Sequence, residues 1–113
     1  MKVIFIAGKY QATTDEELYQ NIQHARTEAR KLWMKGWAVI CPHMNSSFMS
    51  GSDAEENYIY IEGYRELLSR CDAIYMLRGS SYSLGAIEEL NLAEEQGLEI
   101  YYEYKGVPDA PDN

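Results

Sequence analysis

The sequence predicts an α/β fold, a three-layer sandwich whose mostly parallel sheet has four to five strands. Short apolar runs of strand length alternate along the chain with longer segments whose apolar residues recur at helical spacing. Two of the three helical segments stop at a glycine, Gly36 or Gly97, shortly before the next strand. Alternating strands and helices imply right-handed crossovers, which make the sheet parallel and place helices on both of its faces.

The composition is that of one compact globular domain. The chain has 113 residues, of which 46% are hydrophobic and 25% charged, a size and balance typical of a single folded domain. Its formal net charge of −8 disfavours a nucleic-acid polymer as partner, because such partners are normally bound by clustered lysine and arginine. A small nucleotide stays possible, since backbone N–H groups at a helix N-terminus bind phosphate without net positive charge.

Each predicted element has its own signals. The expected strands cover about 2–7, 37–41, 73–77 and 98–101. The expected helices run from a cap at Thr13 or Thr14 to Gly36, from a cap at Ser52 or Asp53 to Cys71, and from about Leu84 to Gln96. Three loops, 8–13, 42–51 and 78–84, should therefore meet at the carboxyl ends of the strands. Doubly wound flavodoxin-like and Rossmann-like sheets bind their ligands at this edge.

We expect one domain over residues 1–104 and a tail at 105–113 that is mobile or docks on a neighbouring copy. Cys41 and Cys71 lack the spacing of zinc or redox sites and should be buried and reduced. Neither a metal nor a cofactor is expected. The first residues have the pattern of a strand rather than a signal peptide, and no run reaches the roughly 20 apolar residues of a membrane span. A cytoplasmic protein without membrane contact is predicted.

The familiar nucleotide-binding motifs are absent. Gly8 and Lys9 follow the first strand, but the second glycine of a P-loop and its Ser or Thr after the lysine are missing. The same turn has one glycine instead of the G-x-G-x-x-G of a dinucleotide-binding fold. Leu77 and Arg78 stand where a phospho-receiver would have an aspartate after its third strand. The sequence therefore disfavours all three classes.

The most informative segment is SLGAIEE at 83–89. A hydroxyl and small residues at a helix N-terminus form a natural anion or sugar site. At about 100° per residue, Ala86 and Leu90 face the sheet, Glu88 lies nearly opposite, and Glu89 lies on the flank as the partly buried carboxylate. Such a glutamate can attack the anomeric carbon of a sugar, as in retaining glycosidases. The alternative is an ordinary solvated helix face, because acids in a first turn also favour the helix dipole.

Four motifs occur in a fixed order along the chain: IAG at 6–8, PH at 42–43, CDAIYML at 71–77 and SLGAIEELNLA at 83–93. In this order they resemble the nucleoside 2-deoxyribosyltransferase-like superfamily, over roughly residues 2–101. More narrowly, the chain resembles the small domains of unknown function called DUF4406. The resemblance implies that Glu89, four residues after Gly85, is the catalytic nucleophile, the residue that the helical-face argument also selects.

The resemblance also implies which residues bind substrate. In the relatives, the first loop and the Ser-x-Gly turn hold the sugar or its 5′-phosphate, which implies Gly8, Lys9, Tyr10, Ser83 and Gly85 here. Tyr64 stands where deoxynucleoside-cleaving relatives carry an acid that faces the base. A tyrosine can stack on a base or hydrogen-bond it, but it is a poorer general acid near neutral pH. The relatives assemble as dimers or larger oligomers, so a homodimer or higher homo-oligomer is expected.

Four other polar residues have a structural interpretation beside a functional one. His43, just beyond the second strand, either contacts a base or sugar hydroxyl or has a structural role. Arg78, directly after the third strand, either meets a phosphate or carboxylate of the substrate or forms a surface salt bridge. Asp72 is expected to bond backbone amides rather than substrate. His24, within the first helix, is expected to be a surface residue.

The sequence thus predicts an enzyme that acts on a small nucleoside or nucleotide, an N-glycosidase or 2-deoxyribosyltransferase with Glu89 as nucleophile. An alternative from another class is a non-catalytic nucleotide-binding module of the same fold, which Tyr64 would allow. A third is a protein-interaction role within an oligomer, for which the acidic charge and the proline-containing tail are the only hints.

Overall fold

A four-stranded parallel sheet forms the centre of the molecule in the computed structural model, which describes residues 1–46 and 54–111. Its strands are β1 (Val3–Ala7), β2 (Ala38–Ile40), β3 (Ala73–Met76) and β4 (Glu99–Tyr102). Their order across the sheet is β2-β1-β3-β4, and all three neighbouring pairs are parallel. The predicted α/β fold with a parallel sheet is confirmed.

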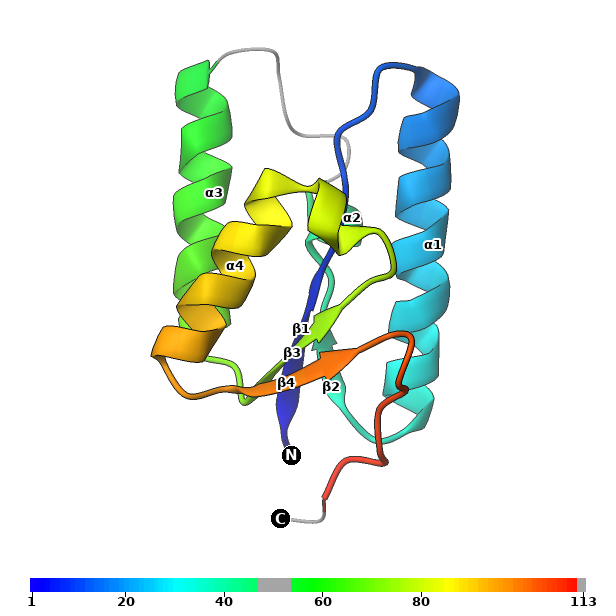
Figure 1. Ribbon diagram of the computed structural model, residues 1–113, viewed down its shortest axis with the longest axis vertical. Coiled ribbons are helices and arrows are strands. Elements are labelled where there is room, and N and C mark those ends of the chain that lie inside the picture. Colours follow the sequence, from blue (N-terminus) through cyan, green and yellow to red (C-terminus); the bar gives the residue numbers. More distant parts are fainter. Residues whose placement is uncertain (47–53, 112–113) are drawn as a thin grey trace.

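Helices cover both faces of this sheet (Figure 1). They are α1 (Asp15–Met34), the single turn α2 (Pro42–Asn45), α3 (Ala54–Ser69) and α4 (Leu84–Glu95), with a short 3₁₀ turn, η1 (Ser80–Tyr82), before α4. α1 lies on one side of the sheet, and α3 and α4 lie together on the other. The molecule therefore has the three layers of a sandwich.

The core has two halves, one on each face of the sheet. Alternate residues of a strand point to opposite faces, so Ile4 and Ile6 of β1 pack toward α1 while Phe5 and Ala7 pack toward α3 and α4. The α1 half includes Ala25, Ala29, Leu32, Trp37 and Tyr75. The α4 half is built from smaller residues, Ala86 and Ala93 among them, together with Leu68 and Ile74. The small side chains let α4 lie close to the sheet, near the loop that follows β1.

The start of α1 is where the sequence places it. The Thr14 hydroxyl accepts a hydrogen bond from the Glu17 amide at 3.1 Å, which makes Thr14 the N-cap. Asp72 also has the structural role expected of it, because its carboxylate accepts from the Val3 amide at 2.8 Å. This bond joins the start of β1 to the chain entering β3.

The chain after β2 differs from the expected loop at 42–51. Residues 42–45 form the helical turn α2, with Pro42 at its first position, where the missing N–H of proline has no cost. Residues 47–51 of that loop and the two predicted caps of the next helix, Ser52 and Asp53, lie outside the described residues.

The segment after Tyr104 packs on its own chain as far as it is described, and its docking on a neighbouring copy stays a prediction. Val107 is buried in the α1 half of the core. The Trp37 indole N–H donates to the Pro108 carbonyl at 3.0 Å, and the Ala110 amide donates to the Lys35 carbonyl at 2.8 Å. The segment thus covers the connection between α1 and β2.

Among the described residues, no helix has both the length and the apolar character that a membrane span requires.

Candidate functional site

A cavity of about 610 Å³ lies at the carboxyl ends of the strands, and we call it the main cavity. The loop after β1, the turn α2, the helix α3 and the start of α4 form its walls. The described residues that line it and that the sequence predicts for the site are Gly8, Lys9, Tyr10, His43, Tyr64, Ser83, Gly85 and Glu89. The structure therefore brings together all of the predicted site residues except Arg78.

The start of α4 forms one wall of the main cavity. Ser83 is its N-cap, and the Ser83 hydroxyl accepts a hydrogen bond from the Ala86 amide at 3.3 Å. Gly85, in the first turn, is exposed, and its missing side chain leaves backbone accessible beside the cavity. This helix N-terminus provides N–H groups and the positive end of a helix dipole, which favour a phosphate or a sugar oxygen.

Glu89 is the partly buried acid on α4. Burial raises the pKa of Glu89 to about 8, the positive charge of Arg65 opposes that rise, and the negative charge of Glu88 adds to it. Glu88 itself is exposed and binds the Arg65 guanidinium at 3.0 Å. Adjacent glutamates therefore have different environments, as the helical-face argument predicts. The protein thus sets the protonation state of Glu89 through burial.

Gly8 fixes the course of the loop after β1. A Cβ atom at this position would lie 2.5 Å from Leu77 Cδ1 and 2.9 Å from Leu77 Cβ, closer than real Cβ contacts come. The loop after β1 thus passes directly against the end of β3, and only glycine permits that approach. The same contact holds Lys9 and Tyr10 at the edge of the main cavity.

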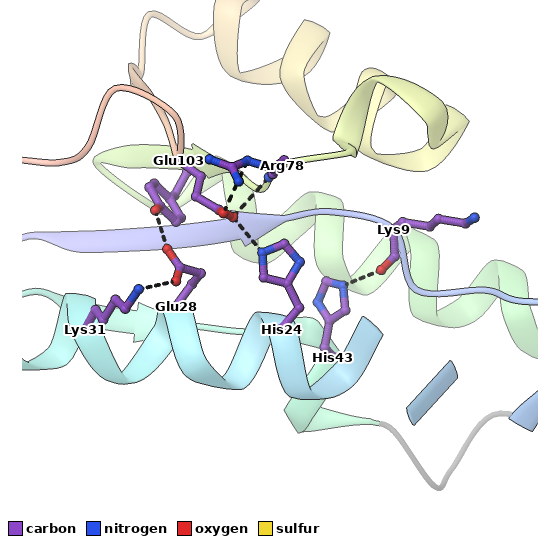
Figure 2. A network of polar contacts seen from close by, with 8 residues as sticks. Lys9, His24, Glu28, Lys31, His43, Arg78 and Glu103 are labelled. Atoms are coloured by element: carbon purple, nitrogen blue, oxygen red, sulfur yellow. Dashed lines mark hydrogen bonds and ion pairs between the residues drawn. The ribbon is translucent and has the colours of Figure 1, made fainter. Parts of the chain in front are cut away.

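His43 connects α2 to the loop after β1. The residue is only 3% exposed, and its Nε2 lies 3.1 Å from the Lys9 carbonyl oxygen (Figure 2). Because a carbonyl only accepts, Nε2 must carry the proton of this hydrogen bond. Burial lowers the pKa of His43, which favours the neutral ring. Nδ1 is then an acceptor, and it has no hydrogen-bond partner among the described residues.

Tyr64 lies on α3, facing α2. Its hydroxyl is 2.6 Å from the Ser46 hydroxyl and donates to the Pro42 carbonyl at 3.4 Å, while the Asn45 amide donates to it at 3.2 Å. The ring packs edge-on against Phe5. Tyr64 therefore lines the main cavity, but its hydroxyl is already hydrogen-bonded to α2 and to Ser46 after it. This environment differs from that of a free acid that faces a base.

Arg78 lies outside the main cavity. It lines a second cavity of about 280 Å³, together with Lys9, Asn21, His24, Leu77, Gly79 and Tyr82. His24 is only half-buried there but is more than a surface residue, because its Nε2 lies 2.7 Å from a carboxylate oxygen of Glu103. The Arg78 amide donates to the same oxygen at 3.0 Å (Figure 2). The spacing of His24 and Glu103 along the sequence gives no sign of this contact.

One wall of the main cavity is absent from the sequence prediction. α3 contributes Asn57, Tyr60, Ile61 and Arg65 in addition to Tyr64. Together with Tyr64, these positions follow the i, i+3, i+4, i+7, i+8 spacing of one helix face, a pattern that residues packed in a core share. Gln11 and Tyr82, on the loops after β1 and β3, also line the main cavity and carry no comparable signal.

Among the described residues, no group of three His, Cys, Asp or Glu side chains gathers closely enough to hold a metal ion.

Comparison with known proteins agrees with this architecture. Residues 2–103 match a sequence family described as a domain of unknown function, DUF7768. A solved structure of a 2-deoxyribosyltransferase from the psychrotolerant bacterium Bacillus psychrosaccharolyticus superposes with a TM-score of 0.69 at 17% sequence identity, covering 88% of this chain and 69% of that one. No curated protein matches the chain. The fold is therefore that of a nucleoside 2-deoxyribosyltransferase, whereas the narrower resemblance to DUF4406 stays a prediction.

Proposed function

The chain belongs to the DUF7768 family, whose function is unknown, and we propose that it is a nucleoside or nucleotide N-glycosidase or 2-deoxyribosyltransferase acting through Glu89. The observation that carries the proposal is the place of Glu89, a partly buried carboxyl group on the wall of a cavity that also contains the Ser83–Gly85 helix N-terminus. An anion or sugar site and a carboxyl nucleophile thus share one cavity, as glycosyl transfer requires.

The reaction has two displacements. A carboxylate oxygen of Glu89 attacks the anomeric carbon of the sugar, and the glycosidic C–N bond breaks with its electron pair on the base. The base takes up a proton from solvent and leaves, and the sugar remains as an ester of Glu89. Water, or the nitrogen of a second base, then attacks the same carbon, gives up a proton to solvent and restores the carboxylate.

Arg65 supports the ionised form of Glu89. The first displacement needs a carboxylate, but burial favours the protonated acid. The Arg65 guanidinium, held by Glu62 at 3.2 Å and Glu88 at 3.0 Å, lines the same cavity and lowers the pKa of Glu89 against the effect of burial. We therefore assign Arg65 as the residue that keeps part of the Glu89 population ionised near neutral pH.

A non-catalytic nucleotide-binding module is the second candidate function, and two observations favour it. The Tyr64 hydroxyl is bound to α2, which leaves no acid at that position to protonate a departing base. With a pKa of about 8, most Glu89 is protonated at pH 7. A protein with these properties would hold a nucleotide in the main cavity without cleaving it.

Base release from a substrate panel separates the two functions. We would incubate the protein with 2′-deoxynucleosides, ribonucleosides and their 5′-monophosphates, and follow free base by chromatography. The glycosidase proposal expects release by the wild type and by Glu94→Gln, which changes an exposed acid farther along α4, and none by Glu89→Gln. Release that persists in Glu89→Gln would exclude Glu89 as nucleophile. A raised melting temperature without release would favour the binding module.

A further inference from the structure

The second cavity lies where a ligand is expected in this fold. In a sheet of order β2-β1-β3-β4, the connections after β1 and β3 run to opposite faces, so the crevice between them is the switch point at which such sheets bind ligands. The second cavity is lined by Lys9 from the first of these connections and by Arg78 and Gly79 from the other, with Asn21 and His24 of α1 closing it. Its position is thus that of a binding site.

The charge of the second cavity is opposite to that of the whole chain. The molecule has 18 acidic residues against 10 lysines and arginines. Lys9, Arg78 and His24 nevertheless line the second cavity, and the described part of its lining contains no acidic side chain. The main cavity, by contrast, is lined by the acids Glu88 and Glu89 alongside Lys9 and Arg65. An anionic group is therefore attracted to the second cavity.

Glu103 orients the donors of the second cavity and leaves Arg78 able to bind an anion. The Glu103 carboxylate accepts from His24 and from the Arg78 backbone amide. Figure 2 shows His24 reaching it from α1 while Arg78 reaches it from the connection after β3. The Arg78 Nε atom forms an ion pair with the Glu103 carboxylate at 3.9 Å, which is too long for a hydrogen bond, and the Arg78 side chain is 74% exposed. The guanidinium therefore remains accessible to a ligand.

The two cavities adjoin each other at residues that line both, Lys9 and Tyr82. Tyr82 directly precedes Ser83, the N-cap at which a first phosphate would bind. A phosphate chain that begins at Ser83 and passes Tyr82 enters the second cavity. The volume of 280 Å³ corresponds to about nine waters at ~30 Å³ each, which is ample for a phosphoryl group.

We propose that the second cavity binds a phosphoryl group beyond the first, and that the substrate of the main cavity is a nucleoside 5′-diphosphate or a longer nucleotide of that class. This inference rests on the proposed function, because it names the substrate class of the same site. The Arg78 guanidinium supplies the charge-assisted hydrogen bonds to the additional phosphate.

Calorimetric titration with 5′-mono- and 5′-diphosphates of ribo- and deoxyribonucleosides tests the proposal. We expect the diphosphate to bind the wild type at least about tenfold more tightly than the monophosphate, the size of one charge-assisted hydrogen bond. Arg78→Gln should abolish the difference. Arg70→Gln is the matched control, because the Arg70 side chain is 75% exposed and pairs with Glu66 on α3. Equal affinities in the wild type, or a difference that survives in Arg78→Gln, would overturn the proposal.

Inorganic pyrophosphate separates this proposal from the proposed function. Its binding, followed by amide chemical shifts at residues 78 and 79, should weaken in Arg78→Gln and persist in Arg70→Gln. If that occurs while no substrate releases base, the glycosidase proposal fails and the anion site stands. If nucleosides release base but pyrophosphate leaves these shifts unchanged, the anion site is wrong and the glycosidase proposal stands.

Discussion

Glu89 makes the proposed reaction depend on pH. Its pKa of about 8 lies above the ordinary value of a glutamate because the side chain is buried. A nucleophile must be ionised, so kcat/KM should rise about tenfold per pH unit below pH 8 and level off above it. The pH profile of base release measures this. A rate that falls as the pH rises from 6 to 9 would mean that Glu89 acts as a proton donor.

Arg65→Gln tests the electrostatic support of Glu89. Removing the guanidinium leaves burial and the charge of Glu88 unopposed, so the pKa of Glu89 should rise above about 8. Carbon-13 NMR of the labelled glutamate carboxyls follows this titration without any assay of activity. Arg70→Gln, directly after the same helix and paired with Glu66, should leave the Glu89 titration unchanged. An identical titration in all three proteins would contradict the role assigned to Arg65.

Alanine substitutions at Gly8 and Gly63 should change the free energy of unfolding in opposite directions. Gly8→Ala places a methyl group against Leu77, so it should lower the free energy of unfolding by about 1–3 kcal/mol, the range of overpacked sites. Gly63 lies within α3, and a methyl group added to it would meet nothing within 4 Å. Gly63→Ala should therefore raise the free energy of unfolding, by up to about 1 kcal/mol. Urea denaturation of both variants checks the pair, and a stable Gly8→Ala would refute the close approach.

At the scale of elements, the C-terminal segment is part of the folded structure. Val107→Ala should lower the free energy of unfolding by about 1–2 kcal/mol, because it removes two buried carbon atoms at about 0.8 kcal/mol each and leaves a space beside Trp37. Asp109→Ala changes an exposed neighbour and should have little effect. Equal melting temperatures for wild type and Val107→Ala would mean that the C-terminal segment does not pack on the core in solution.

The elements that the sequence predicts well are those with several agreeing signals. α1 has a capping threonine, acids in its first turn and a regular apolar stripe, and its start is placed correctly at Asp15. α2 has only four residues and no side-chain cap, so the composition around Pro42 and His43 predicts a loop instead. The cavity-facing side of α3 escapes prediction because tyrosine and isoleucine at helical spacing equally indicate packing residues. Contacts between distant residues, such as His24 with Glu103, have no local signal at all.

For the whole molecule, the homo-oligomer implied by the resemblance remains a prediction, and α3 offers the surface for it. Tyr58 and Ile59 are 59% and 68% exposed on this helix, and exposed apolar groups of this kind mark protein contacts. Light scattering should give a multiple of the 13.0 kDa chain mass, and Ile59→Glu should reduce it to the monomer. Tyr19→Glu, on α1 in the opposite layer, is the control. A monomeric wild type would reject the prediction.

The protonated state of Glu89 has a calorimetric consequence. At pH 7 the free protein carries a proton on most copies of this side chain, whereas a complex poised for attack requires the carboxylate. Forming that complex therefore expels close to one proton per molecule into the buffer. The measured heat of association will then change with the ionisation enthalpy of the buffer, and the slope of that change counts the protons released.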